Sequence, residues 1–238
     1  AGDMIQVFFS DETFSKMRGQ EAVSSEYQKL LQVPHELQVV YEDDLMLIVN
    51  KPSGMLSQKA SESDISLNES ILSYLIHEGF LSEETYAVFH PSVANRLDRN
   101  TSGIVLAGKT LAGQQFLSDI LRDRSAKKIY HCIVRGKVEE EMHLKGYLLK
   151  DERSNQVQIF SDETQDAKPI ETAYRPLVVG PDATLLEVHL ITGRSHQIRA
   201  HLASIGHPIA GDPKYGDMVW NKKLRQNFSV RSQLLHAY

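Results

Sequence analysis

The sequence predicts an α+β fold, with a mixed, largely antiparallel β-sheet core and few flanking helices. Three observations support this prediction. β-rich runs outnumber amphipathic helical stretches, neighbouring runs are joined by short polar turns such as Gly180-Pro181-Asp182, and no internal repeat or heptad pattern occurs. Short turns join antiparallel strands, whereas parallel strands need long crossovers. With 238 residues, of which 41% are hydrophobic, the chain can bury a sizeable core.

The first third of the chain is expected to hold a lead-in, a hairpin and a helix. Residues 1–36 mix polar and apolar positions without a period, which predicts a partly helical or extended lead-in or linker before a body at 37–238. Two β-rich runs at 37–41 and 45–49 are separated by Glu42-Asp43-Asp44, which predicts a hairpin. Asn68 is expected to cap a helix with the apolar stripe Ile71, Leu72, Leu75 and Ile76.

A second helix and a strand are expected in the middle of the chain. Thr110 can cap a helix that ends in the basic run from Arg122 to Lys128. Its expected apolar residues are Leu111, Phe116, Leu117, Ile120 and Leu121. Residues 129–135 then return to a strand, whose period of two places one face on Tyr130, Cys132 and Val134.

The last third is predicted to be mostly strand. β-rich runs at 144–149, 156–160, 170–179 and 184–191 are separated by polar turns. Ser195 is expected to cap a helix carrying Ile198, Leu202 and Ile205, and Gly206-His207-Pro208 ends it.

The charge distribution suggests a basic face on an acidic protein. The formal net charge of −5 argues against a uniformly basic nucleic-acid binder. However, residues 94–130 hold seven Lys and Arg against three Asp, and residues 191–238 hold seven against two. If these two basic segments meet in space, they can bind nucleic acid.

The same composition indicates a cytoplasmic protein. The single Cys132 excludes an internal disulfide framework and fits a reducing compartment. No stretch has the length and apolarity of a membrane span, and the first residues lack the pattern of a signal peptide. Met4 is expected to be the native start.

The polar segment 96–103 is the first candidate site. Asp98 stands between Arg96 and Arg99 in a turn that runs directly into the apolar run 104–106. Strand interiors avoid Asp, Asn, Ser and Gly, so this segment should be a loop at the mouth of the sheet, able to aim a side chain at a ligand. The alternative is a surface turn in which Asp98 pairs with one of its neighbouring arginines.

The segment 193–201 is the second candidate. At helical spacing His196, Arg199 and Ala203 share a face, and Arg194 and Arg199 flank a helix N-terminus that could bind an anion. The alternative is a solvated basic helix start.

Other site chemistries find little support. His196 and His201 are five residues apart, which places them on different faces of a helix, and the paired-cysteine and His-Glu-x-x-His patterns of metal sites do not occur. The chain also has no Gly-x-Ser-x-Gly elbow and no P-loop motif. We therefore expect no metal site.

Residues 95–106, Asn-Arg-Leu-Asp-Arg-Asn-Thr-Ser-Gly-Ile-Val-Leu, resemble the His-Arg-Leu-Asp-x-x-Thr-Ser-Gly motif of the RluA-type pseudouridine synthases. Three more segments resemble this family in the same order. They are Val-Asn-Lys-Pro-Ser-Gly-Met at 49–55, Lys-Ile-Tyr-His-Cys-Ile-Val-Arg-Gly at 128–136, and Gly-Arg-Ser-His-Gln-Ile-Arg at 193–199 continuing through 206–216. The resemblance covers residues 37–238 and implies the pseudouridine synthase catalytic-domain fold.

The resemblance implies site-specific isomerisation of uridine to pseudouridine in structured RNA, without cofactor or metal. By motif position, Asp98 would be the nucleophile, Tyr130 the ring that stacks on the base, with a role in proton transfer, and Arg199 the ion-pair partner of Asp98. A cation beside a carboxylate favours its ionised form, which a nucleophile needs.

Further residues are expected to bind or hold the RNA. The target uridine has to leave its helix or loop, and Arg96 could fill the gap or hold a phosphate. Ile198 would line the uracil pocket, and Arg194 and Lys51 would contact the RNA backbone or support the site.

The expected partner is ribosomal RNA, with transfer RNA as the second choice, and the protein is expected to act as a monomer away from membranes. The alternative function is a non-catalytic RNA-binding or ribosome-assembly module on the same fold.

Three departures from the family pattern lead to expectations. Asn95 replaces the family's His and should change positioning only. Residues 1–36 are too short and acidic to form the small RNA-binding domain of many relatives. The chain stops where relatives continue into another strand, so we expect a truncated C-terminus.

Overall fold

The computed structural model describes residues 20–151 and 153–238, and these residues form one ten-stranded sheet accompanied by six helices. The helices are α2 (Gln20–Leu30), α3 (Leu67–His77), α4 (Glu83–Tyr86), α5 (Leu111–Arg122), α6 (Gln197–Ser204) and α7 (Met218–Phe228). The strands are β1 (Val39–Glu42), β2 (Met46–Lys51), β3 (Ser92–Val93), β4 (Ser102–Gly108), β5 (Ile129–Arg135), β6 (Met142–Asp151), β7 (Gln156–Phe160), β8 (Lys168–Val179), β9 (Ala183–Leu190) and β10 (Leu235–Ala237).

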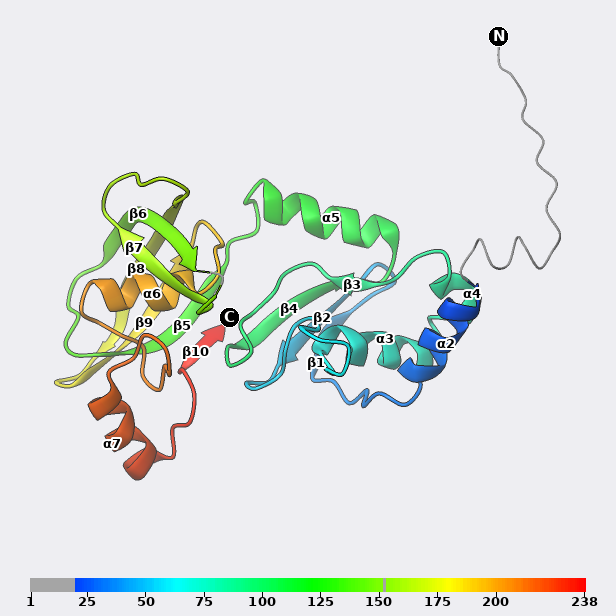
Figure 1. The fold of residues 1–238 in the computed structure, drawn as a ribbon, viewed down its shortest axis with the longest axis horizontal. Helices are drawn as coiled ribbons and strands as arrows, with labels where there is room; N and C mark the ends of the chain where they lie inside the picture. Colours follow the sequence, from blue (N-terminus) through cyan, green and yellow to red (C-terminus); the bar gives the residue numbers. More distant parts are fainter. Residues whose placement is uncertain (1–19, 152) are drawn as a thin grey trace, which may run out of the picture.

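The strand order is β1-β2-β4-β10-β5-β9-β8-β6-β7, and the short β3 pairs with β4. The pairing of β4 with β10 is parallel, and all the other pairings among the described strands are antiparallel. The predicted α+β fold with a mixed, largely antiparallel sheet is therefore confirmed. Figure 1 shows two halves, one with β1–β4 and α2–α5 and the other with β6–β9, α6 and α7, and the C-terminus lies between them.

The predicted hairpin at the start of the body is present as β1 and β2. Asp43 shapes its turn, because its Oδ1 accepts from the Leu45 and Met46 N–H groups, both at 2.8 Å. The preceding lead-in is packed where it is described. Leu30 of α2 is buried in the main core, and the Tyr27 hydroxyl donates to the Leu81 carbonyl at 3.1 Å. Residues 20–30 are helical, in agreement with the expected partly helical lead-in, while residues 1–19 lie outside the described residues.

The helix predicted after Asn68 begins two residues earlier than expected. Its apolar stripe is buried as predicted, but Ser66 is the N-cap, and its N–H donates to Glu69 Oε2 at 3.0 Å. Asn68 has a different task, because its Oδ1 accepts from the Val93 N–H of β3 at 3.0 Å. The short α4 follows this helix.

The helix predicted after Thr110 is α5, and Thr110 Oγ1 caps it by accepting from the Gly113 N–H at 3.1 Å. The predicted apolar face is partly wrong, since Leu111 and Phe116 are 58% and 52% exposed. The reason is that only a narrow strip of this helix contacts the rest of the protein. A Cβ on Gly113 would lie 2.0 Å from the Leu45 carbonyl oxygen, so the helix backbone approaches the hairpin closely there, and Leu117 is buried beside it.

The alternation predicted for β5 is confirmed, because Tyr130, Cys132 and Val134 are buried while their neighbours are half-buried. The four strands expected after it are β6 to β9, some of them longer than predicted. The elements that were not predicted include α7 and β10, besides the short α4 and β3. No residue of α7 is fully buried, although Trp220 and Leu224 are half-buried at helical spacing, and β10 has only three residues, although it lies inside the sheet.

The position of β10 depends on Gly103. Ala237 of β10 is the register partner of Gly103 in the parallel pair. A Cβ on Gly103 would lie 2.1 Å from the Ala237 carbonyl oxygen, and the residue has a φ of +118°. Only glycine adopts that conformation without strain. The loop that carries Asp98 is thereby joined directly to the last strand of the described chain. No helix in the described residues has the length and apolarity needed to cross a membrane.

His201 of α6 should make stability depend on pH. Its side chain is 3% exposed, its Nδ1 lies 3.1 Å from Thr172 Oγ1, and burial lowers the pKa of the ring to about 4. Between the ordinary His pKa near 6.5 and this value, the unfolded chain binds the proton and the folded chain does not. The free energy of unfolding should therefore fall by up to ~3 kcal/mol between pH 7 and pH 4 through this group.

Urea unfolding of the wild type and of His201→Asn across this pH range measures that contribution. The variant should lose stability less steeply than the wild type. Parallel curves would mean that His201 is not the responsible group.

Candidate active site

The loop that carries Asp98 is fixed on both sides of this residue. Ser57 Oγ donates to the Leu97 carbonyl at 2.9 Å and lies 3.0 Å from the Leu97 N–H, while the Thr101 N–H donates to the Asp98 carbonyl at 3.0 Å. Leu97 itself is buried in the core. Asp98 therefore projects from a rigid turn, with its side chain 28% exposed.

Asn95 also positions this loop, as predicted. Its Oδ1 accepts from the Leu106 N–H at 2.8 Å, and its Nδ2 donates to the Ile104 carbonyl at 3.2 Å. Both bonds go to the backbone of β4, so the amide fixes the approach to the loop.

Lys51 supports the loop from below. It is fully buried, and its Nζ donates to the carbonyls of Pro52, Met55 and Arg99 at 2.9, 2.8 and 3.1 Å. Burial lowers the pKa of this ammonium to about 8, against the opposing effect of the Asp98 charge. Of the two predicted roles, support of the site is the one that this geometry favours.

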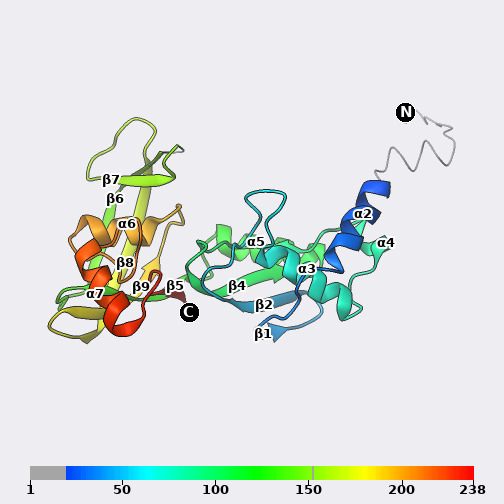
Figure 2. The ribbon, with the colours of Figure 1, turned by 60° about the horizontal axis from the view of Figure 1, so that its bottom comes forward.

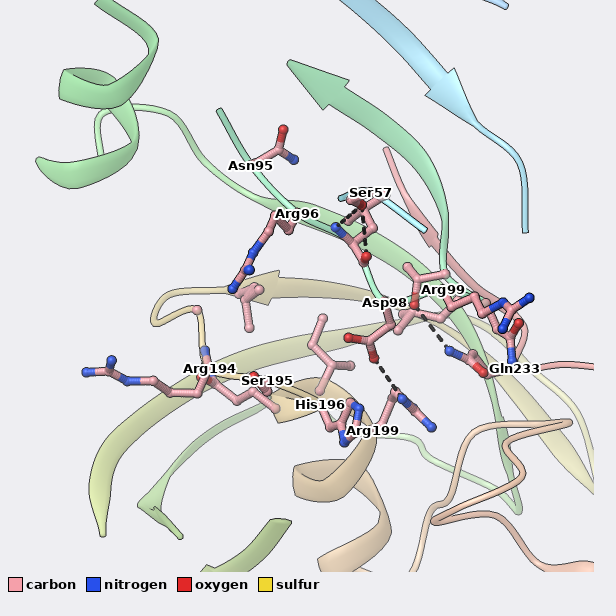
Figure 3. A pocket seen from close by; sticks show the side chains of 18 of the residues that line it. Ser57, Asn95, Arg96, Asp98, Arg99, Arg194, Ser195, His196, Arg199 and Gln233 are labelled. Carbon is pink, nitrogen blue, oxygen red and sulfur yellow. Dashed lines mark hydrogen bonds and ion pairs between the residues drawn. The ribbon is translucent and has the colours of Figure 1, made fainter. Parts of the chain in front are cut away.

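Arg199 joins Asp98 to a second carboxylate. One guanidinium nitrogen, Nη1, lies 2.7 Å from Asp98 Oδ2, which confirms the predicted ion pair (Figure 3). The other side of the guanidinium binds Asp212 twice, with Nε 2.7 Å from Oδ2 and Nη2 2.9 Å from Oδ1. Such a two-point contact fixes the plane of an arginine. The alternative of a surface pair between Asp98 and Arg96 or Arg99 is thus wrong.

Asp212 is a site residue that the sequence analysis did not single out. It is buried, and its Oδ1 also accepts from the N–H groups of Lys214 and Tyr215, at 2.8 and 3.1 Å. Burial alone would raise the pKa of this carboxyl, but the hydrogen bonds and charge of Arg199 outweigh burial and lower it. Burial likewise opposes the charged form of Arg199. The hydrogen bonds and charge of Asp212, and to a smaller extent those of Asp98, outweigh burial and raise the pKa of Arg199 well above its ordinary value. Arg199 therefore stays charged.

A sequence signal for Asp212 existed. It stands between Gly211 and Pro213, after the apolar pair Ile209-Ala210, inside a segment that resembles the family. The position inside this segment was the signal, because Gly-Asp-Pro by itself is typical of a turn and does not predict a buried carboxylate.

The start of α6 differs from the prediction. The N-cap is His196, in the left-handed conformation with φ 54°, rather than Ser195. No side chain caps this helix, and the buried side chain of Gln197 instead holds the preceding turn, because its Oε1 accepts from the Arg194 N–H at 3.1 Å. His196 Nδ1 lies 2.9 Å from the Tyr215 hydroxyl, and burial lowers the pKa of its ring. The predicted anion site does not use Arg199, which is occupied by two carboxylates.

Asp98 opens into a pocket of about 830 Å³, lined by residues of both basic segments and of the loop around Ser57. Tyr130 and Ile198 are part of its wall and are 7% and 4% exposed. Burial and then the Asp98 charge raise the pKa of Tyr130 to about 12, so its hydroxyl is protonated at neutral pH. A pocket of this size, with an aromatic wall and a carboxylate, can hold a nucleotide.

The rim of the pocket carries cations without acidic partners. Arg96, Arg194 and Lys128 line it, and within the described residues none of the three forms an ion pair. Burial and the charge of Arg124 lower the pKa of Lys128. Arg96 and Arg194 lie on one side of Asp98, and Arg99 lies on the other (Figure 3). The two basic segments thus meet at this pocket, as predicted.

Comparison with known proteins gives consistent results. A family model described as RNA pseudouridylate synthase matches residues 45–204. The chain is 33% identical over 222 residues to a ribosomal large subunit pseudouridine synthase C of Haemophilus ducreyi, covering 93% of this chain and 65% of the relative. The chain therefore spans less than two thirds of that relative's length. It is 34% identical over 212 residues to a tRNA pseudouridine synthase C of Vibrio cholerae, covering 84% of this chain and 83% of the relative.

A solved structure gives the same fold. The human RNA pseudouridylate synthase domain containing 1 superposes with a TM-score of 0.66 at 23% sequence identity, over 86% of this chain and 77% of that one.

Proposed function

The chain belongs to the RNA pseudouridylate synthase family, and on that premise we propose that it isomerises a specific uridine to pseudouridine in structured RNA. Ribosomal RNA is the preferred substrate in this proposal and transfer RNA the second, with the protein acting as a cytoplasmic monomer without cofactor. The observation that carries the proposal is the Asp98–Arg199–Asp212 chain at the edge of a nucleotide-sized pocket beside Tyr130.

The reaction breaks the bond between N1 of uracil and C1′ of ribose and forms a bond between C5 and C1′. N1 gains a proton, and the hydrogen on C5 is lost as a proton. Asp98 would act as the nucleophile, on either the sugar or the base, because its carboxyl group is partly exposed and aimed by Arg199. The unpaired cations Arg96, Arg194 and Lys128 would hold the phosphates of the extruded nucleotide.

Tyr130 would stack on the uracil and take part in proton transfer. Tyr130→Phe keeps the ring, so we expect KM within about threefold of wild type and a kcat about 10²-fold lower, a common size for a lost proton-transfer group. Tyr130→Leu also removes the stacking surface, which is worth about 1–3 kcal/mol per base, so KM should rise about tenfold as well. Steady-state kinetics on one RNA transcript distinguish the two roles. A Tyr130→Phe variant with wild-type kcat would remove the hydroxyl from the mechanism.

Tritium release tests the function itself. Transcripts of large-subunit ribosomal RNA and of transfer RNAs, labelled with tritium at C5 of uridine, should lose tritium to water in the presence of the full chain. Release from one class only would identify the substrate. Binding to both classes without release from either would overturn the proposal and support a non-catalytic RNA-binding or assembly module.

A further inference from the structure

Helix α7 is the one helix of the described residues with eight or more residues that buries none of its own side chains. Met218, Val219 and Phe228 are 85%, 71% and 72% exposed. In both Figure 1 and Figure 2 the helix lies at the margin of the half that carries α6. The helix contacts the body through the half-buried Trp220, Asn221 and Leu224, and its other sides face solvent.

The segment from Met218 to Arg231 is strongly basic. It contains Lys222, Lys223, Arg225 and Arg231 and no Asp or Glu, within a protein of net charge −5. All four side chains are exposed, and none forms an ion pair within the described residues. Other exposed arginines of the protein, such as Arg122, Arg135 and Arg175, do pair with carboxylates. The positive charge of α7 is therefore uncompensated.

α7 is also tied directly to the active site. Asn221 Oδ1 accepts from the Gly211 N–H, and Asn221 Nδ2 donates to the Asp212 carbonyl, both at 2.8 Å. Asp212 in turn holds Arg199. At its start, Asp217 caps the helix through the Trp220 N–H at 2.7 Å and pairs with Arg135. Since Lys214, four residues before Met218, lines the pocket, the helix continues from the pocket rim outwards.

We propose that α7 is a docking surface for the phosphate backbone of the substrate RNA, outside the nucleotide that enters the pocket. This inference rests on the proposed function. Exposed cations without carboxylate partners are available to phosphates, and each phosphate contact releases condensed counterions. The exposed Phe228 adds a ring on which an unpaired base can stack. RNA held on α7 would also steady Asp212, and through it Arg199, while the uridine is in the pocket.

The test compares two triple charge reversals. Lys222→Glu/Lys223→Glu/Arg225→Glu changes α7, and Lys29→Glu/Lys137→Glu/Lys145→Glu changes exposed lysines away from the pocket by the same total charge. Melting temperature is measured first to confirm that both fold. KM for tritium release and Kd from filter binding are then measured with ribosomal and transfer RNA transcripts at several salt concentrations.

The α7 variant should raise KM and Kd at least tenfold, and the slope of log K against log salt should become about 2–3 shallower, as three phosphate contacts at about 0.9 each require. The control should change KM by no more than its general charge effect, about twofold. Equal shifts in the two variants would overturn the inference. So would unchanged RNA binding together with lost binding to phosphatidylserine vesicles, which would assign α7 to a membrane surface. Absence of tritium release by the wild type would instead refute the proposed function.

Discussion

Asp98→Asn is expected to lower kcat for tritium release by about 10⁴-fold or more, the scale seen when a nucleophile is removed from an enzyme whose other groups remain. Asparagine has nearly the same shape but no charge and cannot form the covalent bond that the proposed mechanism needs. Asp98 is 28% exposed on its side chain, so the change should cost little stability. RNA affinity should change only a few-fold, because the phosphate-binding cations remain.

Asp119→Asn is the matched control. Asp119 also pairs with an arginine, Arg122, but on the exposed surface of α5. Its loss should leave kcat and KM at wild-type values, since exposed pairs contribute little. If Asp98→Asn retains more than about 1% of wild-type kcat under the same conditions, the nucleophile assignment is wrong, although the family membership stands.

Site residues could be predicted from the sequence only where the pattern lies among neighbouring residues. Asp98 could be singled out from its own loop, because it lies between two arginines in a polar turn that ends at an apolar strand. Its pairing with Arg199, 101 positions along the chain, came only from the family resemblance. Asp212 and the position of His196 as N-cap were not predicted, because both depend on the folded structure. Asp212 is defined by the guanidinium it holds, and His196 by a left-handed backbone that no composition rule predicts.

The fold shows the same division. The period-two pattern of β5 and the apolar stripe of α3 were predictable because one buried face imposes a repeat on consecutive residues. Helices α3 and α6 do not have the predicted N-caps. The side chain of Asn68 binds the backbone of β3, and the side chain of Gln197 binds the turn before α6. β10 was not predicted because three residues are too few to show a period. It fits between β4 and β5 because Gly103 has no Cβ, which would otherwise clash with its backbone.

The second large effect is expected from Asp212→Asn. The guanidinium of Arg199, which is 5% exposed, donates one hydrogen bond to each carboxylate oxygen of Asp212. Asparagine is neutral and has only one acceptor oxygen, so one of these hydrogen bonds would be lost. Breaking a buried ion pair by removing one partner costs about 3–5 kcal/mol. For a chain of this size, that lowers the melting temperature by about 10 °C. Thermal unfolding at pH 7 measures it.

The same substitution should reduce kcat well below the melting temperature, because Asp212 is what fixes the plane of Arg199 toward Asp98. A double-mutant cycle with Arg199→Met separates the two effects. Removing both charges together avoids an unpaired buried ion, so Asp212→Asn/Arg199→Met should be more stable than the sum of the two single losses predicts. Its kcat should remain as low as that of Arg199→Met, since an aimed cation next to Asp98 is still missing. If Asp212→Asn lost stability but kept wild-type kcat at 25 °C, Asp212 would hold the fold together without positioning the catalytic pair.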